Sequence, residues 1–158
     1  MKTAQNFMRR AIELSGEYMR AGLGGPFGAI IVRGQEILAE GCNRVTSTND
    51  PTAHAEMVAI REACRHIGGF SLAGCELYTS CEPCPMCLGA LYWAELDRVL
   101  FAVSGDEAAR FYPGERRYHR AVDFYAQYTL PFAQRRLPMQ LERREEGVRL
   151  FEHWKDLN

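Results

Sequence analysis

The sequence predicts an α/β protein folded as a three-layer α/β/α sandwich. Helix-like and strand-like stretches alternate along the middle of the chain, which implies parallel strands with helices covering the sheet. A hairpin pattern near the start adds an antiparallel pair to that sheet. The chain has 158 residues, of which 47% are hydrophobic, enough to bury one core without disulfides. We therefore expect a single domain over residues 1–158.

The first predicted elements are a helix and a hairpin. Apolar residues recur at three- and four-residue spacing over residues 3–21, which is typical of an amphipathic helix. A glycine-rich turn ends this helix. Two short strand-like runs follow, 27–32 and 36–42, separated by a three-residue turn. Asn43 lies directly after the second strand.

Helix and strand alternate in the next part of the chain. A helix is predicted after a polar loop, because four apolar residues share one face. They are Met57, Ile60, Cys64 and Ile67. A strand follows at 76–80, and Pro83 and Pro85 suit the first turn of a second helix, which runs through Tyr92. A further strand is predicted at 98–103.

The sequence after Ser104 is less regular. Residues 106–128 mix helical spacing with Pro113 and Gly114, whereas 143–155 again has the spacing of a helix. Arginine and glutamate alternate in this part of the chain, which indicates a solvated face and not a patch that binds nucleic acid.

The overall charge limits the class of partner. The formal net charge is -1, whereas a nonspecific nucleic-acid binder would be basic. We therefore expect a small, neutral partner and no nucleic acid. The longest uncharged run, 21–32, is too short to cross a bilayer, so we expect no membrane partner. Charges throughout the first residues rule out a secretory signal, so we expect a cytoplasmic protein whose six cysteines stay reduced.

Two short motifs carry the chemistry. One is His54-Ala55-Glu56, and the other places Cys84 and Cys87 three residues apart. Zinc takes thiolate and imidazole ligands in a tetrahedron, and a catalytic site keeps three protein ligands and leaves the fourth position for water. Cys84 and Cys87 share one face of a helix's first turn, and His54 opens the other predicted helix. If the two helix N-termini meet at one edge of the sheet, these three residues hold one metal ion.

Glu56 is the candidate general acid and base. Near the start of its helix it can reach the same cavity as His54 without being a ligand. Zinc lowers the pKa of a bound water to about 7, and a carboxylate within reach can take the water proton and pass it to a substrate. The two motifs together therefore predict metal-assisted hydrolysis.

Other interpretations of the cysteines stay open. A lone Cys-x-x-Cys can be a redox pair, although the thioredoxin-like context is absent here. A closed structural zinc site would need a fourth ligand, for which Cys81 is the candidate. The remaining cysteines are most simply small buried hydrophobes. They are Cys42, Cys64 and Cys75.

Three longer segments resemble the cytidine deaminase superfamily. They are GGPFGAIIV at 24–32, NDPTAHAEMVAIR at 49–61 and LYTSCEPCPMCLGALYWA at 77–94. The motifs His-x-Glu and Pro-Cys-x-x-Cys within them are those of zinc-dependent nucleobase deaminases. Within the superfamily the chain is most similar to small bacterial and plant guanine deaminases. The resemblance implies a cytidine deaminase-like fold, with a mixed five-stranded sheet.

The resemblance also implies roles for individual residues. In the chemical centre, it implies proton transfer by Glu56 and binding of one zinc ion per chain by His54, Cys84 and Cys87. In the substrate pocket, it implies a hydrogen bond between the purine and Asn43, aromatic contacts from Phe27 and Trp93, and orientation of the site or ammonia release by Glu82. An ordinary place in the core is the alternative for the two aromatic residues. Related enzymes form homodimers, and the guanine deaminases exchange their C-terminal segments between subunits.

The resemblance weakens after the predicted strand at 98–103. Guanine deaminases carry a Phe-Asp-Asp stretch there, whose aspartate recognises the purine, and this chain lacks that triplet. The chain holds an insertion between 111 and 137, and Asp123 is the candidate for the recognising acid, with a surface aspartate as the alternative. The family's aromatic C-terminal residue is also absent. We therefore expect residues 104–158 to form a divergent C-terminal segment that subunits exchange.

Taken with the resemblance, the motifs predict a zinc-dependent aminohydrolase of purine metabolism that converts guanine and water to xanthine and ammonia. Another substrate stays open: cytosine, a different purine, a triazine, a nucleoside, or adenosine in transfer RNA. An alternative from another class of protein is a non-catalytic interaction module that zinc stabilises.

Overall fold

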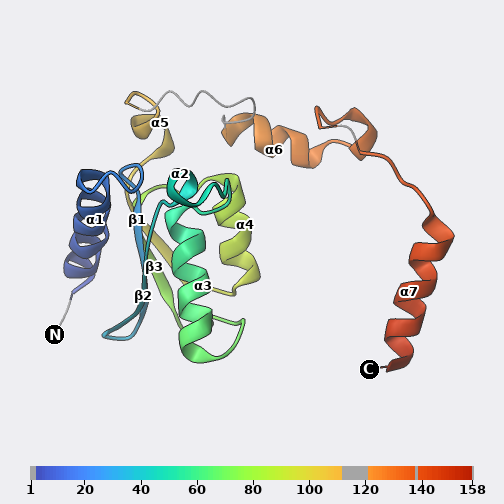
Figure 1. Ribbon diagram of the computed structural model, residues 1–158, viewed down its shortest axis with the longest axis horizontal. Helices are drawn as coiled ribbons and strands as arrows, with labels where there is room; N and C mark the ends of the chain where they lie inside the picture. The colour runs from blue at the N-terminus through green and yellow to red at the C-terminus, as the bar shows by residue number, and fades with distance from the viewer. Residues whose placement is uncertain (1–2, 112–120, 138, 158) are drawn as a thin grey trace. The chain divides into compact units, whose positions relative to one another are not determined.

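The computed structural model describes residues 3–111, 121–137 and 139–157 (Figure 1). In this part of the chain four strands form one mixed sheet, in the order β2-β1-β3-β4. The strands are β1 (Gly28–Arg33), β2 (Glu36–Cys42), β3 (Glu76–Cys81) and β4 (Arg98–Val103). β1 is antiparallel to both of its neighbours, whereas β3 and β4 are parallel.

The strand directions bring the starts of two helices to one edge of the sheet. β2 and β3 are both antiparallel to β1, so they run in the same direction, and α3 (Ala55–Ile67) connects them. α4 (Pro85–Trp93) connects β3 to the parallel β4. Because the carboxyl ends of such strands lie at the same edge, α3 and α4 both begin there. The predicted strand–helix–strand order thus gives parallel strands, with β1 inserted between the first two.

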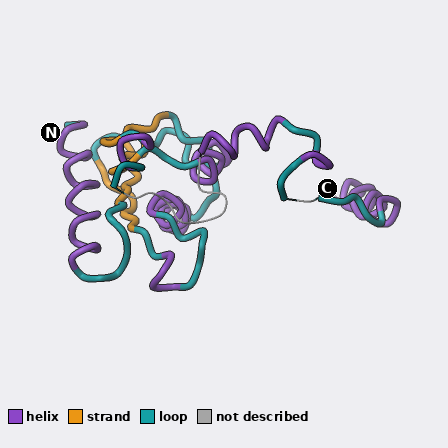
Figure 2. Tube along the Cα trace, turned by 90° about the horizontal axis from the view of Figure 1, so that it is seen from above, coloured by secondary structure: helices purple, strands orange, loops and turns teal. Residues whose placement is uncertain are grey.

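Helices cover both faces of the sheet, as predicted. α1 (Ala4–Arg20) packs on one face, and α3 and α4 lie on the other (Figures 1 and 2). Alternate residues of β1 face opposite sides: Ile30 contributes to the core under α1, and Ile31 to the core under α3. The molecule therefore has the three layers of an α/β/α sandwich.

An ion pair fastens α1 to the edge strand β2. The Arg10 guanidinium donates two hydrogen bonds to the Glu40 carboxylate, each 2.7 Å long, and a third to Glu17 at 2.9 Å. At the N-terminus of α1, the Thr3 hydroxyl accepts a hydrogen bond from the Asn6 amide at 3.4 Å. The helix occupies almost all of the predicted stretch 3–21.

The expected fifth strand is not found among the described residues. Instead, the chain enters α5 (Gly105–Ala108) directly after β4. The Ser104 hydroxyl accepts from the Glu107 amide, and the Glu107 carboxylate accepts from the Ser104 amide, which is a capping box. Since this cap starts a helix at Ser104, the next residues cannot continue as an extended strand.

The chain divides into two compact units, Met1–Glu115 and Arg116–Asn158. The second unit contains α6 (Ala121–Thr129), a 3-10 turn (Phe132–Gln134) and α7 (Arg144–Leu157). α7 corresponds to the helix predicted at 143–155. Its Leu150 and Leu157, which share one face by their spacing, are both exposed. No helix in the described part of the chain is long and apolar enough to span a membrane.

Candidate metal centre

The candidate site is built on the first residues of α3 and α4. His54 is the N-cap of α3 and Cys84 the N-cap of α4, and both have extended backbone. An N-cap side chain commonly accepts a hydrogen bond from its own helix. Neither His54 nor Cys84 does so. Pro85 starts α4 at the position where its missing N–H costs nothing.

Three potential ligand atoms meet between these helix ends. His54 Nδ1 lies 3.5 Å from Cys84 Sγ and 3.6 Å from Cys87 Sγ. Zinc–sulfur bonds of about 2.3 Å and zinc–nitrogen bonds of about 2.0 Å at tetrahedral angles separate ligand nitrogen and sulfur by about 3.5 Å. The side chains of this chain thus already have the spacing that one tetrahedral zinc ion requires. Their assignment as ligands stays a prediction.

The donor set leaves one coordination position to a non-protein ligand. Among the described residues, His54, Cys84 and Cys87 are the one group of three metal-binding side chains within 4.8 Å of one another. Cys81, the candidate for a fourth ligand, is outside that group, at the end of β3. Cys87 is buried, whereas His54 and Cys84 are half-buried. Three protein ligands with partial exposure are the arrangement of a catalytic zinc site.

The two thiols differ in their readiness to ionise. A hydrogen bond with Cys87 lowers the pKa of Cys84 to about 4. The same bond, together with burial, raises the pKa of Cys87. One thiolate is therefore available at neutral pH without a metal, and a divalent cation favours release of the second proton.

A buried carboxyl group lies beside the cluster. Glu56 is the second residue of α3 and is only 7% exposed. Burial raises the pKa of Glu56 to about 7, whereas a hydrogen bond with its own backbone acts in the opposite direction. Its side chain also contacts the Cys87 thiol. A carboxyl group that exchanges protons near neutral pH suits general acid and base work.

Glycines bring the surrounding backbone close to the site. A β-carbon on Gly41 would collide with the Ala55 carbonyl oxygen and the Ala59 amide nitrogen, so β2 touches the first turns of α3. A β-carbon on Gly24 would likewise collide with the carbonyl oxygen of Asn43. Sequence reasoning missed these contacts, because only the packing shows which backbone lies opposite each glycine.

Asn43 is held at the end of β2 by its own backbone and by its side chain. Its amide donates to the Phe27 carbonyl at 3.1 Å, and its Oδ1 accepts from the Val45 amide, also at 3.1 Å. Since a backbone amide can only donate, this bond fixes the amide oxygen toward Val45 and turns Nδ2 away from it. Phe27 is partly buried against the core that contains Ala55.

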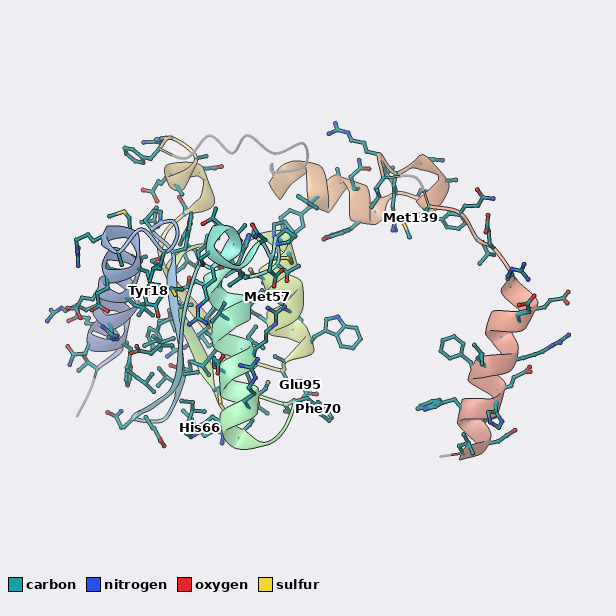
Figure 3. The ribbon with its side chains drawn as sticks, in the orientation of Figure 1. Tyr18, Met57, His66, Phe70, Glu95 and Met139 are labelled. Atoms are coloured by element: carbon teal, nitrogen blue, oxygen red, sulfur yellow. The ribbon has the colours of Figure 1, made fainter. Side chains whose placement is uncertain are left out.

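Trp93 is not brought to the metal cluster. It is the last residue of α4 and is 88% exposed. The nine residues of α4 separate it from the Cys84 end by about 13 Å along the helix axis. In Figure 3, Glu95, which lies just past the end of α4, is labelled near Phe70 and away from Met57 in the first turn of α3.

The other two predicted substrate residues have different positions. Glu82 is exposed, and it donates its amide to the Val103 carbonyl at 2.8 Å while its carboxylate accepts from the Gly105 amide at 2.8 Å. It thus ties the loop before Cys84 to the start of α5. Asp123 belongs to α6 in the second unit, and its side chain lies outside the described residues.

Comparison with known proteins gives the chain its relatives. Residues 1–103 match the family described as cytidine and deoxycytidylate deaminase zinc-binding region. A guanine deaminase of Bacillus subtilis (strain 168) is 50% identical over 131 residues, which cover 82% of this chain and 84% of the relative. A tRNA-specific adenosine deaminase of Aquifex aeolicus (strain VF5) is 51% identical over 77 residues, 49% of this chain and 51% of the relative.

Solved structures agree with these matches. The crystal structure of guanine deaminase from Bacillus subtilis has a TM-score of 0.89 at 42% identity, covering 98% of this chain and 95% of that one. A guanine deaminase structure from Nitrosomonas europaea has a TM-score of 0.65 at 32% identity, and the match covers 75% of this chain and 70% of that one. The family match spans the sheet as far as β4 and includes all three candidate ligands. This chain therefore belongs to the cytidine and deoxycytidylate deaminase family, whose cofactor is zinc.

Proposed function

We propose that this chain is a zinc-dependent aminohydrolase that converts guanine and water to xanthine and ammonia. The observation that carries the proposal is the open three-ligand cluster beside the buried Glu56 carboxyl group. Guanine as substrate is supported by the relative that is 50% identical over most of both chains. That match covers 82% of the chain, so it extends past β4 into the part that the zinc-binding region does not include.

In the proposed mechanism, His54, Cys84 and Cys87 hold zinc. When bound, zinc acts as a Lewis acid that lowers the pKa of water to about 7. Glu56 takes a proton from water and delivers it to a ring nitrogen of the base, while the water oxygen bonds to the carbon that carries the amino group. Glu56 would then take the second proton, from the hydroxyl group now on that carbon, and transfer it to the amine, so that the carbon–nitrogen bond breaks, the carbonyl forms and ammonia leaves.

The substrate would be read by residues around this centre. We propose that Asn43 donates a hydrogen bond from Nδ2, the end of its amide that faces away from Val45. Phe27, which directly precedes β1, would contact the face of the base. Asp123 would supply the recognising carboxylate, either to its own site or to that of a partner subunit. Glu82 would orient the loop that carries Cys84. Trp93 is not given a role in this proposal, because it lies at the opposite end of α4 from Cys84.

The proposed assembly is a cytoplasmic homodimer in which residues 104–158 are exchanged. The exposed Leu150 and Leu157 on α7 are an apolar face that a partner subunit would cover. The two thiols of the cluster persist in the reducing cytoplasm.

Ammonia release tests the proposed reaction. Zinc-loaded protein would be offered guanine, guanosine, adenine, cytosine and a triazine in parallel. Release from guanine, with little from the others, is the expected result. Preference for another base would overturn guanine as the substrate while keeping the hydrolytic mechanism. Release from none of them would overturn the aminohydrolase and favour the interaction module, which chelation should then unfold.

Deamination of adenosine in transfer RNA is the second candidate. It is favoured by the tRNA-specific adenosine deaminase that is 51% identical over 77 residues. The net charge of -1 opposes it, because RNA binding depends on basic surfaces and falls steeply with salt. Filter binding of transfer RNA at two salt concentrations separates the two candidates: we expect weak binding at both.

A further inference from the structure

We propose that Asp50 is a positioning residue that fixes the turn presenting His54 to the metal cluster. The inference rests on the proposed function, because it concerns the histidine that we propose as a zinc ligand. Asp50 lies in the loop between α2 (Val45–Thr48) and α3, four residues before His54. No role for it follows from the zinc-ligand spacing or from the proton-transfer chemistry.

The Asp50 carboxylate organises the loop through Thr52. One oxygen, Oδ1, accepts a hydrogen bond from the Thr52 amide at 2.8 Å and another from the Thr52 hydroxyl at 2.7 Å. The Asp50 carbonyl also accepts from the Ala53 amide at 3.1 Å. The loop is thus closed on itself over four residues. These hydrogen bonds also lower the pKa of Asp50, so the carboxylate is ionised at neutral pH.

The closed loop is bonded directly to the backbone of His54. The His54 amide donates to the Thr52 carbonyl at 2.8 Å, and the Thr52 amide donates to Asp50. Thr52 is therefore hydrogen-bonded both to Asp50 and to His54. The next carbonyl, that of Ala53, accepts from the Arg44 amide at 2.9 Å. Because the His54 side chain does not cap α3, these backbone hydrogen bonds determine the position of the His54 α-carbon, from which the imidazole side chain extends.

Arg61 ties the same loop to the body of α3. Its guanidinium donates to the Thr52 hydroxyl at 3.2 Å and lies 3.7 Å from the second Asp50 oxygen. The hydroxyl has one proton, which goes to Asp50, so it can only accept from Arg61. The hydrogen bond and the ion pair of Arg61 therefore hold the loop before His54 against α3, and they restrain the angle between the loop and the helix.

The positioning role matters because the metal cluster has narrow geometric tolerance. His54 must hold Nδ1 between two sulfur atoms that belong to a different helix. A change in the N-cap backbone would rotate the ring away from the sulfur atoms, even though Asp50 itself touches no ligand atom in the cluster. Mutation of a group that supports a metal ligand typically weakens metal affinity by about 10–100-fold.

The test compares Asp50 variants in the full-length protein by zinc affinity and by the absorption spectrum of the cobalt(II)-substituted protein. Asp50→Ala should raise the zinc Kd about tenfold in competition with a chelator, and it should alter the cobalt spectrum. Asp50→Asn keeps an oxygen that can accept both Thr52 bonds, so it should rescue both readouts. Thr52→Val removes the hydroxyl bond to Asp50 and the bond from Arg61 but keeps the amide bond to Asp50, so it should give a smaller change of the same kind.

Asp97→Ala is the matched control. Asp97 is an exposed aspartate that, like the half-buried Asp50, accepts a hydrogen bond from a backbone amide, that of Gly74 at 3.0 Å, but its loop does not lead to a ligand. The Asp97→Ala variant should have a lower Tm but unchanged zinc affinity and an unchanged cobalt spectrum.

Two different failures are distinguishable. Wild-type zinc affinity and spectrum in Asp50→Ala would overturn the positioning role alone. Failure of the wild-type protein to bind either metal with thiolate ligands would overturn the metal site, and with it both the inference and the proposed function.

Discussion

Gly41 on β2 lies so close to Ala55 in the first turn of α3 that no β-carbon fits between them. This contact sets how far the start of α3 stands from the sheet, and therefore where His54 and Glu56 lie. Gly41→Ala should push α3 outward and destabilise the fold by about 1–3 kcal/mol, the range typical of overpacking. Thermal unfolding and zinc content measure the two effects.

Gly69→Ala is the control for that substitution. Gly69 has no atoms within 4 Å of an added β-carbon and no left-handed backbone. It should change the free energy of unfolding by less than about 0.5 kcal/mol. Equal Tm values for the two alanine variants would show that the close contact at Gly41 does not restrict the side chain at this position.

Glu56→Gln should separate metal binding from chemistry. The amide has nearly the same shape as the buried carboxyl group but cannot shuttle a proton. We expect full zinc content and a turnover rate lower by about 100-fold or more. Zinc analysis and ammonia release on the same preparation check this, and comparable turnover in the variant would remove Glu56 from the mechanism.

Cys84→Ala and Cys64→Ala should differ in metal content. Cys84 belongs to the three-ligand cluster, whereas Cys64 lies on α3 against the apolar core. Removing a cluster thiol leaves two protein ligands, so we expect the purified Cys84 variant to lose its zinc. The Cys64 variant should keep one zinc per chain. Loss of zinc from both would point to general unfolding and not to a ligand role for Cys84.

The pair Arg10–Glu40 should contribute measurably to stability. Its two hydrogen bonds form a fork, and the two side chains are 31% and 35% exposed. A double-mutant cycle with Arg10→Met and Glu40→Gln should give a coupling free energy of about 1 kcal/mol. The more exposed pair Arg143–Glu146 should give less than about 0.5 kcal/mol in the same denaturant experiment.

Leu150→Glu should report on the proposed dimer. If a partner subunit covers the apolar face of α7, a charge there should shift the mass measured by sedimentation from two chains to one. Glu152→Ala, on the opposite face by its spacing, should leave the mass unchanged. An unchanged mass in Leu150→Glu would exclude that face from the interface.

Local patterns in the sequence were sufficient to predict most of the first unit. The strands at 36–42 and 98–103 have the predicted bounds, because alternation, turns and prolines are encoded by neighbouring residues. The convergence of His54 with Cys84 was also predictable, since both start helices that follow strands running in the same direction. The capping box from Ser104 to Glu107 was readable as well, although the resemblance led to a fifth strand instead.

Features that depend on distant packing could not be predicted. Nothing around Gly41 in the sequence indicates that Ala55 will lie against it. Asp50 offered a weak signal, because aspartate two residues before threonine favours a turn, but the bond from Thr52 to His54 emerges only in three dimensions.

The two hydrogen bonds of Glu82 mark where this chain is free to diverge. Its partners are Val103 and Gly105, so neither of these bonds to the loop before Cys84 involves a residue beyond 105. The family match ends at residue 103, almost at the same point. Changes in length or sequence beyond Gly105 can therefore accumulate without removing either of the two bonds that hold the loop before Cys84.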